Sequence, residues 1–348
     1  MSGTNSLHIG IVSWDYDPPI GGMGHHVASL SSGLRAAGHR VSVFSRSNLP
    51  LPFGRSILFS FLLGFFLRRW IRKSSLDILH VHAGPGGVFL MTKPKGLPLI
   101  VTANHTYVDQ VRYVGEQWKR ILVLFERRTY RMADSILCIS ADTALSLRHD
   151  YGIAPEKLTV IPCGIDIRKF AACDLPLAER KRQCVFVGRS DRRKGFDLLE
   201  AAWKIVQEKI PDAQLHVVGI AAPSMSSVTY HDHCSDQELA MLLGSSRVLV
   251  CPSRLEGFGL AAAEAIASGT PVVASDVPGL RSVVLNFETG LLITPDPECI
   301  ATKLIPLLTE DALWERFHTG CQRQRSAFDA SIETEKHIRE YLRYTERQ

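Results

Sequence analysis

Apolar positions along the chain follow two alternating patterns. Short runs of β-branched residues are typical of buried strands, and the longer segments between them carry apolar residues at spacings of three and four, which predicts helices. Val27, Leu30 and Leu34 show the helical spacing, and Gly38 is expected to end that helix. This alternation is typical of a parallel, doubly wound sheet. In the first half the predicted strands are Leu7–Ser13, Arg40–Ser45, Ile78–His82, Leu99–Ala103, Ser135–Ile139 and Leu158–Ile161.

The segment 170–182 interrupts the pattern, and a second series of strands follows it. We therefore expect a linker there and an α/β protein of two Rossmann-like domains, 1–170 and 183–325. Sheets of this kind bind ligands at the carboxyl ends of their strands, which predicts a central cleft faced by both sheets. Residues 326–348 are expected to form a helix that crosses back to the first domain. The strands of the second series are Gln183–Gly188, Gln214–Val218, Val248–Pro252, Val272–Ser275 and Gly290–Ile293.

Ser56–Leu67 is almost wholly apolar and is followed by Arg68, Arg69, Arg72 and Lys73. A transmembrane helix needs about 20 apolar residues, so this stretch is too short to span a bilayer. It is either a buried core helix or an amphipathic helix that lies on anionic lipid.

Composition narrows the class of protein. The 348 residues, 45% of them hydrophobic and 22% charged, suit a folded protein of about two domains. The eight cysteines include no C-x-x-C pair, so neither a disulfide framework nor a zinc site is predicted. The start of the chain lacks the pattern of a secretory signal, which favours a cytoplasmic protein.

Charge is distributed unevenly. Residues 1–174 carry 20 Lys and Arg against 12 Asp and Glu, or +8, and the remainder carries 20 against 23, or −3. A basic half suits phosphate, nucleic acid or an anionic membrane, although scattered solvated charges explain it equally well. Basic residues do not cluster with aromatics, which argues against nucleic acid as a partner.

A glycine-rich loop, residues 14–24, joins the first strand to a helix that we expect to open at His25 and His26. Unpaired amides and the helix dipole there favour a phosphate beside Gly21 and Gly22, and the alternative is a tight structural turn. Asp15 and Asp17 have the spacing of a metal-binding pair, but nothing nearby supplies further hard oxygen ligands. No metal site is predicted.

The second series opens with a strand that ends at Gly188 and is followed by Arg189 and Lys194. Two cations in one loop suit a diphosphate leaving group, whose negative charge grows as its bond breaks. A solvated basic turn is the alternative. Further along, Glu256 lies in a glycine turn before a helix expected to begin near Gly259, where it can accept hydrogen bonds from sugar hydroxyls.

Glu264 lies more than a turn inside the same helix, among alanines. A carboxylate among small residues is costly unless a donor pairs with it, so this position favours a ligand hydroxyl over a helix-capping role.

Taken together in order, these segments resemble the family-4 retaining glycosyltransferases, which have the GT-B fold. The resemblance spans nearly the whole chain, and the combination of segments is specific where each alone is not. It rests on Pro18–Gly24, Gly38–Val41, Asp77–His82, Thr102–His105, Ile161–Asp166, Phe186–Ser190 with Lys194 and Gly195, and Pro252–Glu264.

The resemblance implies transfer of a sugar from a nucleotide diphosphate donor to a carbohydrate or lipid-linked acceptor. The departing phosphate takes the acceptor's proton, so neither an enzyme nucleophile nor a cofactor is implied. Synthesis of a polysaccharide or glycolipid, with peripheral contact to an anionic membrane, would suit such an enzyme. The implied roles are donor-sugar contact for Glu256 and His105, ribose contact for Glu264, diphosphate contact for Arg189 and Lys194, phosphate or anomeric contact for Gly22, and shaping of the donor site by Gly188, Gly257, Phe258, Gly259 and Leu260.

Two departures from the family pattern stand out. Val277–Ser282 lacks the glutamate of the family's Gly-Gly-x-x-Glu, so no catalytic role is assigned there, and Cys163 replaces a common asparagine. A nucleotide-sugar epimerase of the same fold and a non-catalytic sugar-nucleotide-binding protein remain as alternatives. A dinucleotide oxidoreductase is disfavoured, because the first strand–helix turn lacks G-x-G-x-x-G.

Overall fold

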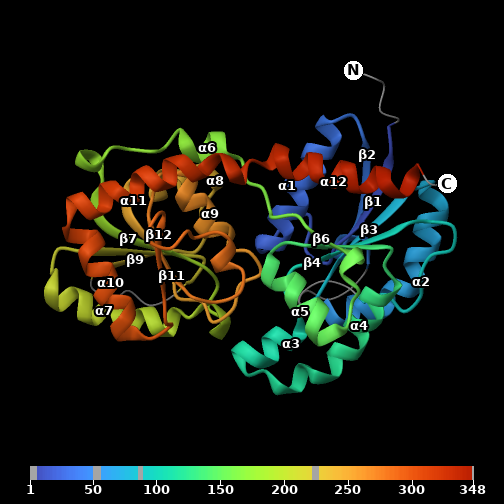
Figure 1. Ribbon diagram of the computed structural model, residues 1–348, viewed down its shortest axis with the longest axis horizontal. Coiled ribbons are helices and arrows are strands. Elements are labelled where there is room, and N and C mark those ends of the chain that lie inside the picture. The colour runs from blue at the N-terminus through green and yellow to red at the C-terminus, as the bar shows by residue number, and fades with distance from the viewer. Residues whose placement is uncertain (1–5, 50–55, 85–88, 222–226, 347–348) are drawn as a thin grey trace. The chain divides into compact units, whose positions relative to one another are not determined.

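The computed structural model describes residues 6–49, 56–84, 89–221 and 227–346. It divides into two compact units: unit 1 comprises Met1–Gly164 and Ala330–Gln348, and unit 2 comprises Ile165–Asp329. Each contains a sheet of six parallel strands with helices on both faces (Figure 1). The prediction of two doubly wound α/β sheets is thus confirmed.

The sheet of unit 1 has the strand order β2-β1-β3-β4-β5-β6. Alternate residues of the central strands point to opposite faces, and both faces are apolar because helices cover both. On one face Ile9 and Ile11 pack with Leu30 of α1 and Tyr341 of α12. On the other, Val81 and Val101 pack with helices α2, α4 and α5. The strands are β1 (His8–Val12), β2 (Arg40–Phe44), β3 (Ile78–Ala83), β4 (Leu99–Ala103), β5 (Ser135–Cys138) and β6 (Leu158–Val160).

Local signals explain the helix boundaries of unit 1. The Ser140 hydroxyl accepts a hydrogen bond from the Thr143 amide, 3.2 Å away, and so caps the helix that follows β5. The first helix ends before Gly38, whose φ of +90° suits glycine. The helices are α1 (Gly22–Ala36), α2 (Ser56–Ser74), α3 (Tyr107–Asp109), α4 (Leu122–Met132), α5 (Ala141–Tyr151) and α12 (Ala330–Thr345), with single turns η1 (Arg46–Asn48), η2 (Gln110–Val114), η3 (Gln117–Ile121) and η4 (Pro155–Lys157).

Helix α2 contains the apolar stretch Ser56–Leu67. Phe59, Leu63 and Leu67 recur at helical spacing and are buried in the core of unit 1, while Phe66 is exposed. The side chains of residues 56–58, 61 and 65 lie outside the described part of the chain. The buried face supports the core-helix interpretation, and contact of α2 with lipid stays a prediction. Within the described residues, no helix combines the length and apolar character needed to cross a membrane.

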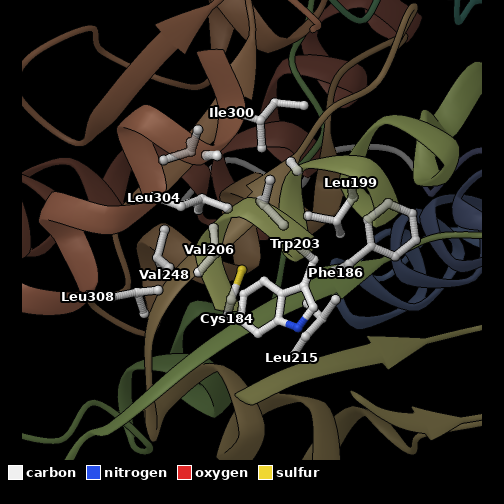
Figure 2. Close-up of a cluster of buried hydrophobic side chains, with 14 of the residues drawn as sticks. Cys184, Phe186, Leu199, Trp203, Val206, Leu215, Val248, Ile300, Leu304 and Leu308 are labelled. Carbon is white, nitrogen blue, oxygen red and sulfur yellow. The ribbon is translucent and has the colours of Figure 1, made fainter. Parts of the chain in front are cut away.

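The sheet of unit 2 has the order β12-β11-β10-β7-β8-β9. Trp203 of α7 is fully buried in the core of unit 2, near Phe186 and Leu215 (Figure 2). The edge strand β9 was not predicted, because it is short and its side chains are partly exposed. The strands are β7 (Lys181–Val187), β8 (Gln214–Val218), β9 (Val228–His231), β10 (Ser246–Cys251), β11 (Val272–Ser275) and β12 (Gly290–Ile293).

The helices of unit 2 lie on both faces of its sheet (Figure 1). Helix α9 begins after Gly259, as predicted, and contacts β10 and β11. The helices are α6 (Ile167–Ala171), α7 (Phe196–Lys209), α8 (Asp236–Gly244), α9 (Leu260–Ala267), α10 (Pro297–Thr309) and α11 (Asp311–Gln324), with turns η5 (Leu177–Glu179), η6 (Arg192–Lys194), η7 (Leu280–Ser282) and η8 (Arg325–Phe328).

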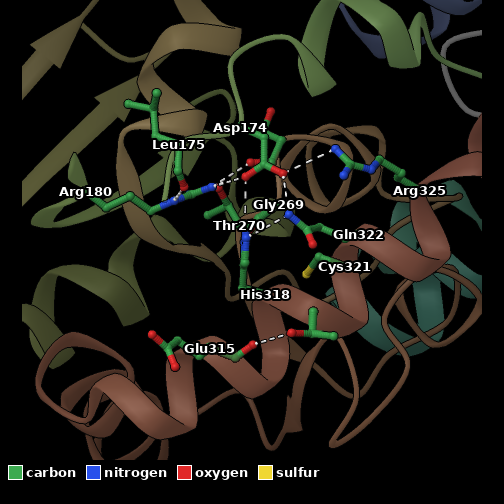
Figure 3. A network of polar contacts seen from close by, with 12 residues as sticks. Asp174, Leu175, Arg180, Gly269, Thr270, Glu315, His318, Cys321, Gln322 and Arg325 are labelled. Carbon is green, nitrogen blue, oxygen red and sulfur yellow. Dashed lines mark hydrogen bonds and ion pairs between the residues drawn. The ribbon is translucent and has the colours of Figure 1, made fainter. Parts of the chain in front are cut away.

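The expected linker at 170–182 is instead part of unit 2, which the chain enters at Ile165 and leaves at Asp329. The reason is the buried Arg180, whose guanidinium donates to Asp174 Oδ1 at 2.8 Å, to Thr270 Oγ1 at 2.7 Å and to the carbonyls of Leu175, Ser246 and Ser268 (Figure 3). Every branch of this fork has a partner, so Arg180 joins the segment to the rest of unit 2.

Candidate functional site

Two loops of unit 2 meet at one edge of its sheet. One follows β7 and the other follows β10, and these strands are parallel neighbours, so their carboxyl ends lie together. Close packing joins the loops: the Arg254 amide donates to the Arg193 carbonyl at 2.7 Å. Gly195 has a φ of +70°, and a Cβ there would lie 2.0 Å from the Pro252 carbonyl oxygen. Only glycine permits this approach. It fixes the loop that follows β7 against the loop that follows β10.

Glu256 is the centre of this arrangement. Its side chain is buried, and Oε1 accepts from Lys194 Nζ at 2.6 Å and from Ser253 Oγ at 2.9 Å. Oε2 accepts from Arg193 Nη1 at 2.9 Å. Burial acts to raise the pKa of this carboxyl, but the charges of Lys194 and Arg193 outweigh it and lower the pKa to about 2. Glu256 is therefore an oriented, ionised hydrogen-bond acceptor.

The two basic residues predicted to contact a diphosphate, Arg189 and Lys194, differ in their surroundings. Lys194 is mostly buried against Glu256, whereas the Arg189 side chain is 61% exposed, with Nη2 3.6 Å from Asp191 Oδ2. The structure also brings in Arg193, which donates to the Leu255 carbonyl as well as to Glu256. Sequence reasoning missed this residue, because three successive cations look alike and only the geometry of the η6 turn decides which one faces Glu256.

The glycine turn leads directly into α9. Phe258 is buried and contacts Phe328 edge to face, with ring centroids 6.3 Å apart. Gly259 has a φ of +102°, and a Cβ there would lie 2.7 Å from a methyl group of Leu280. Packing against Phe328 and Leu280 thus holds the turn formed by Gly257, Phe258, Gly259 and Leu260. This keeps Glu256 at the carboxyl end of the strands.

Glu264 projects from the second turn of α9 and is partly exposed. Burial and the charge of Asp236 raise its pKa to about 7, although Lys194 and Lys169 act in the opposite direction. Within the described residues, the Glu264 carboxylate has no hydrogen-bond partner. A carboxylate in these surroundings gains by accepting a bond from a ligand hydroxyl.

The glycine loop of unit 1 is shaped by Asp15. Its carboxylate accepts from the amides of Ile20, Gly21 and Gly24 at 2.8, 2.9 and 3.1 Å and lies 3.2 Å from Arg46 Nη1. The expected phosphate position beside Gly21 is therefore corrected, because Asp15 already takes that amide. The first helical bond of α1 runs from His25 to Gly21, so the Gly22 and Met23 amides point beyond the helix and remain suited to an anion.

His105 follows β4 in unit 1 and is partly exposed. Its Nε2 lies 3.1 Å from Gln110 Nε2, and the Gln110 carbonyl accepts from Lys119. This arrangement orients the ring. His80 is buried, with Nε2 2.6 Å from Thr102 Oγ1 and Nδ1 2.7 Å from the Tyr341 hydroxyl, which makes it part of the core.

Comparison with known proteins bears on both units. Residues 20–169 match the model of Glycosyltransferase Family 4, and residues 168–323 match that of Glycosyl transferases group 1. The chain is 27% identical to the MMP alpha-(1->4)-mannosyltransferase of Mycolicibacterium hassiacum, over 83% of this chain and 86% of the relative. It is likewise 27% identical to a phosphatidyl-myo-inositol mannosyltransferase of Mycobacterium tuberculosis, over 96% of both chains.

Among solved structures, the sucrose-phosphate synthase of Thermosynechococcus elongatus superposes with a TM-score of 0.82 at 24% identity, covering 98% of this chain and all of that one. That likeness establishes the fold. The two family models together cover most of the chain, from the glycine loop through the glutamate turn. The chain therefore belongs to the family-4 glycosyltransferases of GT-B fold.

Proposed function

We propose that the protein transfers a hexosyl group from a nucleoside diphosphate sugar to an acceptor with retention of anomeric configuration. The observation that carries this proposal is the ionised Glu256, held between Lys194 and Arg193 where β7 and β10 end. A fixed carboxylate accepts hydrogen bonds from sugar hydroxyls. Adjacent cations stabilise the charge that develops on a departing diphosphate.

The remaining residues are proposed in supporting roles. Arg189 and Lys194 contact the diphosphate, Glu264 accepts from the ribose, and Gly22 and His105 act on the phosphate or sugar. Gly188 and the turn from Gly257 to Leu260 leave room for the donor. The donor is a substrate rather than a cofactor, and neither a metal ion nor another cofactor is part of the proposal.

In the proposed reaction the bond between the anomeric carbon and the phosphate oxygen breaks as the acceptor oxygen bonds to that carbon from the same face. The acceptor's proton passes to the departing phosphate, so the products are the glycoside and a nucleoside diphosphate. The protein then contributes position and electrostatic stabilisation instead of a nucleophile. Retention follows from the same-face entry.

The names of the relatives suggest the class of sugar. Two of them are called mannosyltransferases, one acting on phosphatidyl-myo-inositol. We infer a mannosyl or glucosyl donor and an acceptor that is a carbohydrate or a lipid-linked molecule.

The experiment starts with thermal-shift screening of nucleoside diphosphates and their sugars, because a ligand of the native state raises its stability. Donors that bind are then incubated with and without carbohydrate and lipid-linked acceptors, and the product anomer is identified by NMR. Acceptor-dependent release of nucleoside diphosphate and a retained anomer are expected. Glu256→Gln should abolish most of this release, whereas Glu208→Gln, on the exposed side of α7, should not.

Two other outcomes would contradict the proposal. Conversion of the donor to its epimer without acceptor would identify a nucleotide-sugar epimerase. Donor binding without any turnover across the acceptor panel would identify a non-catalytic sugar-nucleotide-binding protein.

A further inference from the structure

Three apolar side chains form an exposed ridge on unit 1. Trp118, Ile121 and Leu124 are 60%, 62% and 65% exposed, which makes them the most exposed large hydrophobic residues in the described part of the chain. They recur every third residue along η3 and into α4. In a 3₁₀ turn, residues three apart lie above one another, so the three side chains share one side of the segment. Exposed apolar residues gathered in this way commonly mark a binding surface.

Arginines surround this ridge. Arg127, Arg128 and Arg131 line a surface hollow of about 440 Å³ together with Leu124 and Met132. Arg127 donates to the Asp150 carbonyl and Arg128 to the Met91 carbonyl, at 2.8 and 3.0 Å. Both acceptors are neutral. Across the described residues, none of Arg120, Arg127, Arg128 and Arg131 forms an ion pair with a carboxylate.

No acidic side chain offsets these charges at the surface of α4. The helix contains one carboxyl, Glu126, and it is fully buried. There it accepts from the Tyr151 and Tyr130 hydroxyls and from the Tyr107 amide. The exposed charged side chains of α4 are therefore all cationic, and Glu116, just before η3, is paired with Lys119 at 2.7 Å.

The surface continues onto α2. Arg68 Nη2 lies 3.4 Å from Thr92 Oγ1, and the neighbouring Met91 is 43% exposed and bonded to Arg128 through its carbonyl. Arg72 contacts the Arg68 carbonyl one turn further along α2. The loop at Met91 and Thr92 thus joins the basic side of α2 to α4, and both helices belong to unit 1 (Figure 1).

We propose that this surface, the α2–α4 surface (Arg68, Arg72, Met91, Trp118, Arg120, Ile121, Leu124, Arg127, Arg128 and Arg131), docks the protein on an anionic lipid bilayer. Trp118, Ile121 and Leu124 enter the boundary between headgroups and acyl chains. The exposed arginines of the surface extend to the lipid phosphates, as their long stems allow, whereas Arg127 is held by the Asp150 carbonyl. A bilayer fits because apolar and cationic groups lie together on one surface, which matches the two layers of a lipid interface.

Docking on a bilayer would bring the enzyme to a lipid-linked acceptor, and in this way it deepens the proposed function. The access to such an acceptor rests on the proposed function, whereas the docking itself does not. It also places the membrane contact mainly on η3 and α4. The described apolar side chains of α2 that repeat at helical spacing are buried in the core instead. Vesicle binding by itself needs neither donor nor acceptor, so its failure and the failure of sugar transfer are distinguishable.

The test uses co-sedimentation of the whole chain with vesicles of phosphatidylcholine, alone or with one third phosphatidylglycerol. We expect binding to the anionic vesicles that weakens as salt rises, and little binding to phosphatidylcholine alone. Tryptophan fluorescence should shift to the blue on binding, and Trp118→Phe should remove most of that shift while preserving binding. Failure to bind anionic vesicles at low salt would overturn the proposal.

Two sets of variants locate the contact. Arg120→Gln, Arg128→Gln and Arg131→Gln combined should lower the partition onto anionic vesicles about 100-fold, given the usual contribution of each arginine near a charged surface. Trp118→Ser, Ile121→Ser and Leu124→Ser combined should lower it to a similar degree. Circular dichroism and binding of nucleoside diphosphate should stay unchanged in both sets, which shows that the fold is intact.

Matched controls come from unit 2, where Lys204, Lys209 and Lys303 are exposed on α7 and α10. Changing all three to Gln alters net charge equally and should leave vesicle binding nearly intact. Met241→Ser with Phe287→Ser is the apolar control. A loss in either control equal to that in the surface variants would overturn the proposal, as would sedimentation equilibrium showing that the ridge pairs two copies of the chain.

Discussion

Lys194 Nζ lies 2.6 Å from Glu256 Oε1, so the residue proposed for the diphosphate is paired with the residue proposed for the sugar. From the sequence these two roles belong to separate loops. The structure couples them, because the ammonium that meets the phosphate also holds the carboxylate in place. Substitutions of Glu256 and of Lys194 are therefore expected to differ in their effects on sugar transfer and nucleotide binding. Each substitution also removes a hydrogen-bond partner of the other residue.

Glu256→Gln should reduce transfer about 100-fold or more, because it removes the charge that accepts from sugar hydroxyls in the transition state. Affinity for free nucleoside diphosphate should hold or rise, since Lys194 loses a competing partner. Lys194→Ala and Arg189→Ala should weaken nucleotide binding as well, by about 1.5–3 kcal/mol per charge-assisted bond. Calorimetry and initial rates measure both effects. Equal loss of nucleotide affinity in all three variants would contradict the assignment of Glu256.

Arg193→Gln should shift the acid limb of the pH profile of kcat/KM to higher pH. Arg193 helps to lower the pKa of Glu256 to about 2, so without this cation Glu256 becomes protonated at a higher pH. In the parent protein the stability that this ionised carboxylate contributes is present above about pH 4.5 and is lost as pH falls toward 2. Arg193→Lys should partly restore the limb, and Arg192→Gln, on an exposed neighbour, should leave it unchanged. An unmoved limb in Arg193→Gln would exclude this positioning role.

Transfer should persist in excess EDTA, because Lys194, Arg189 and the start of α1 are proposed to meet the charge of the diphosphate. The measurement is the initial rate before and after treatment with chelator, with added magnesium or manganese as a comparison. Complete loss of activity that either ion restores would show that the diphosphate needs a metal.

Stability should fall as pH rises from about 4.5 to about 8 because of Glu126. Burial raises the pKa of this carboxyl to about 8, even though its tyrosine hydroxyl and amide bonds act to lower it. Between those pH values the folded chain binds a proton that the unfolded chain releases, so ionisation favours unfolding by roughly 4 kcal/mol at the upper end. Glu126→Gln should flatten the dependence of the unfolding midpoint on pH. The same slope in both proteins would show that other groups cause it.

Arg180→Lys should destabilise unit 2 by about 3–5 kcal/mol, because lysine cannot supply the fork that satisfies Asp174 and the buried carbonyls. The guanidinium lies 4.8 Å from the centre of the Trp314 ring, so tryptophan fluorescence reports on this region during urea unfolding. Arg182→Lys, two residues along on an exposed side chain, is the matched control. Equal unfolding midpoints in the two variants would contradict this role for Arg180.

Strand positions were largely predictable, since burial on both faces of a parallel sheet demands continuous apolar runs that are visible in the sequence. Leu99–Ala103 and Val272–Ser275 agree with β4 and β11 to the residue. The edge strand β9 is an exception, because its pattern of burial is weak. Glu256 and Lys194 could also be named in advance, as their loops follow strands that end at one edge.

What the sequence alone determined is therefore the class of fold, the order of its elements and the loops that carry charged groups, because these depend on local periodicity and on residues near one another in the chain. Tertiary structure decided which charges meet. Arg193 rather than Arg189 reaches Glu256, Asp15 takes the Gly21 amide, and Arg180 binds the expected linker into unit 2. In each contact the two residues belong to different segments of the chain, and the direction of a side chain decides whether they meet. Such a contact is specified only when the separate segments pack together.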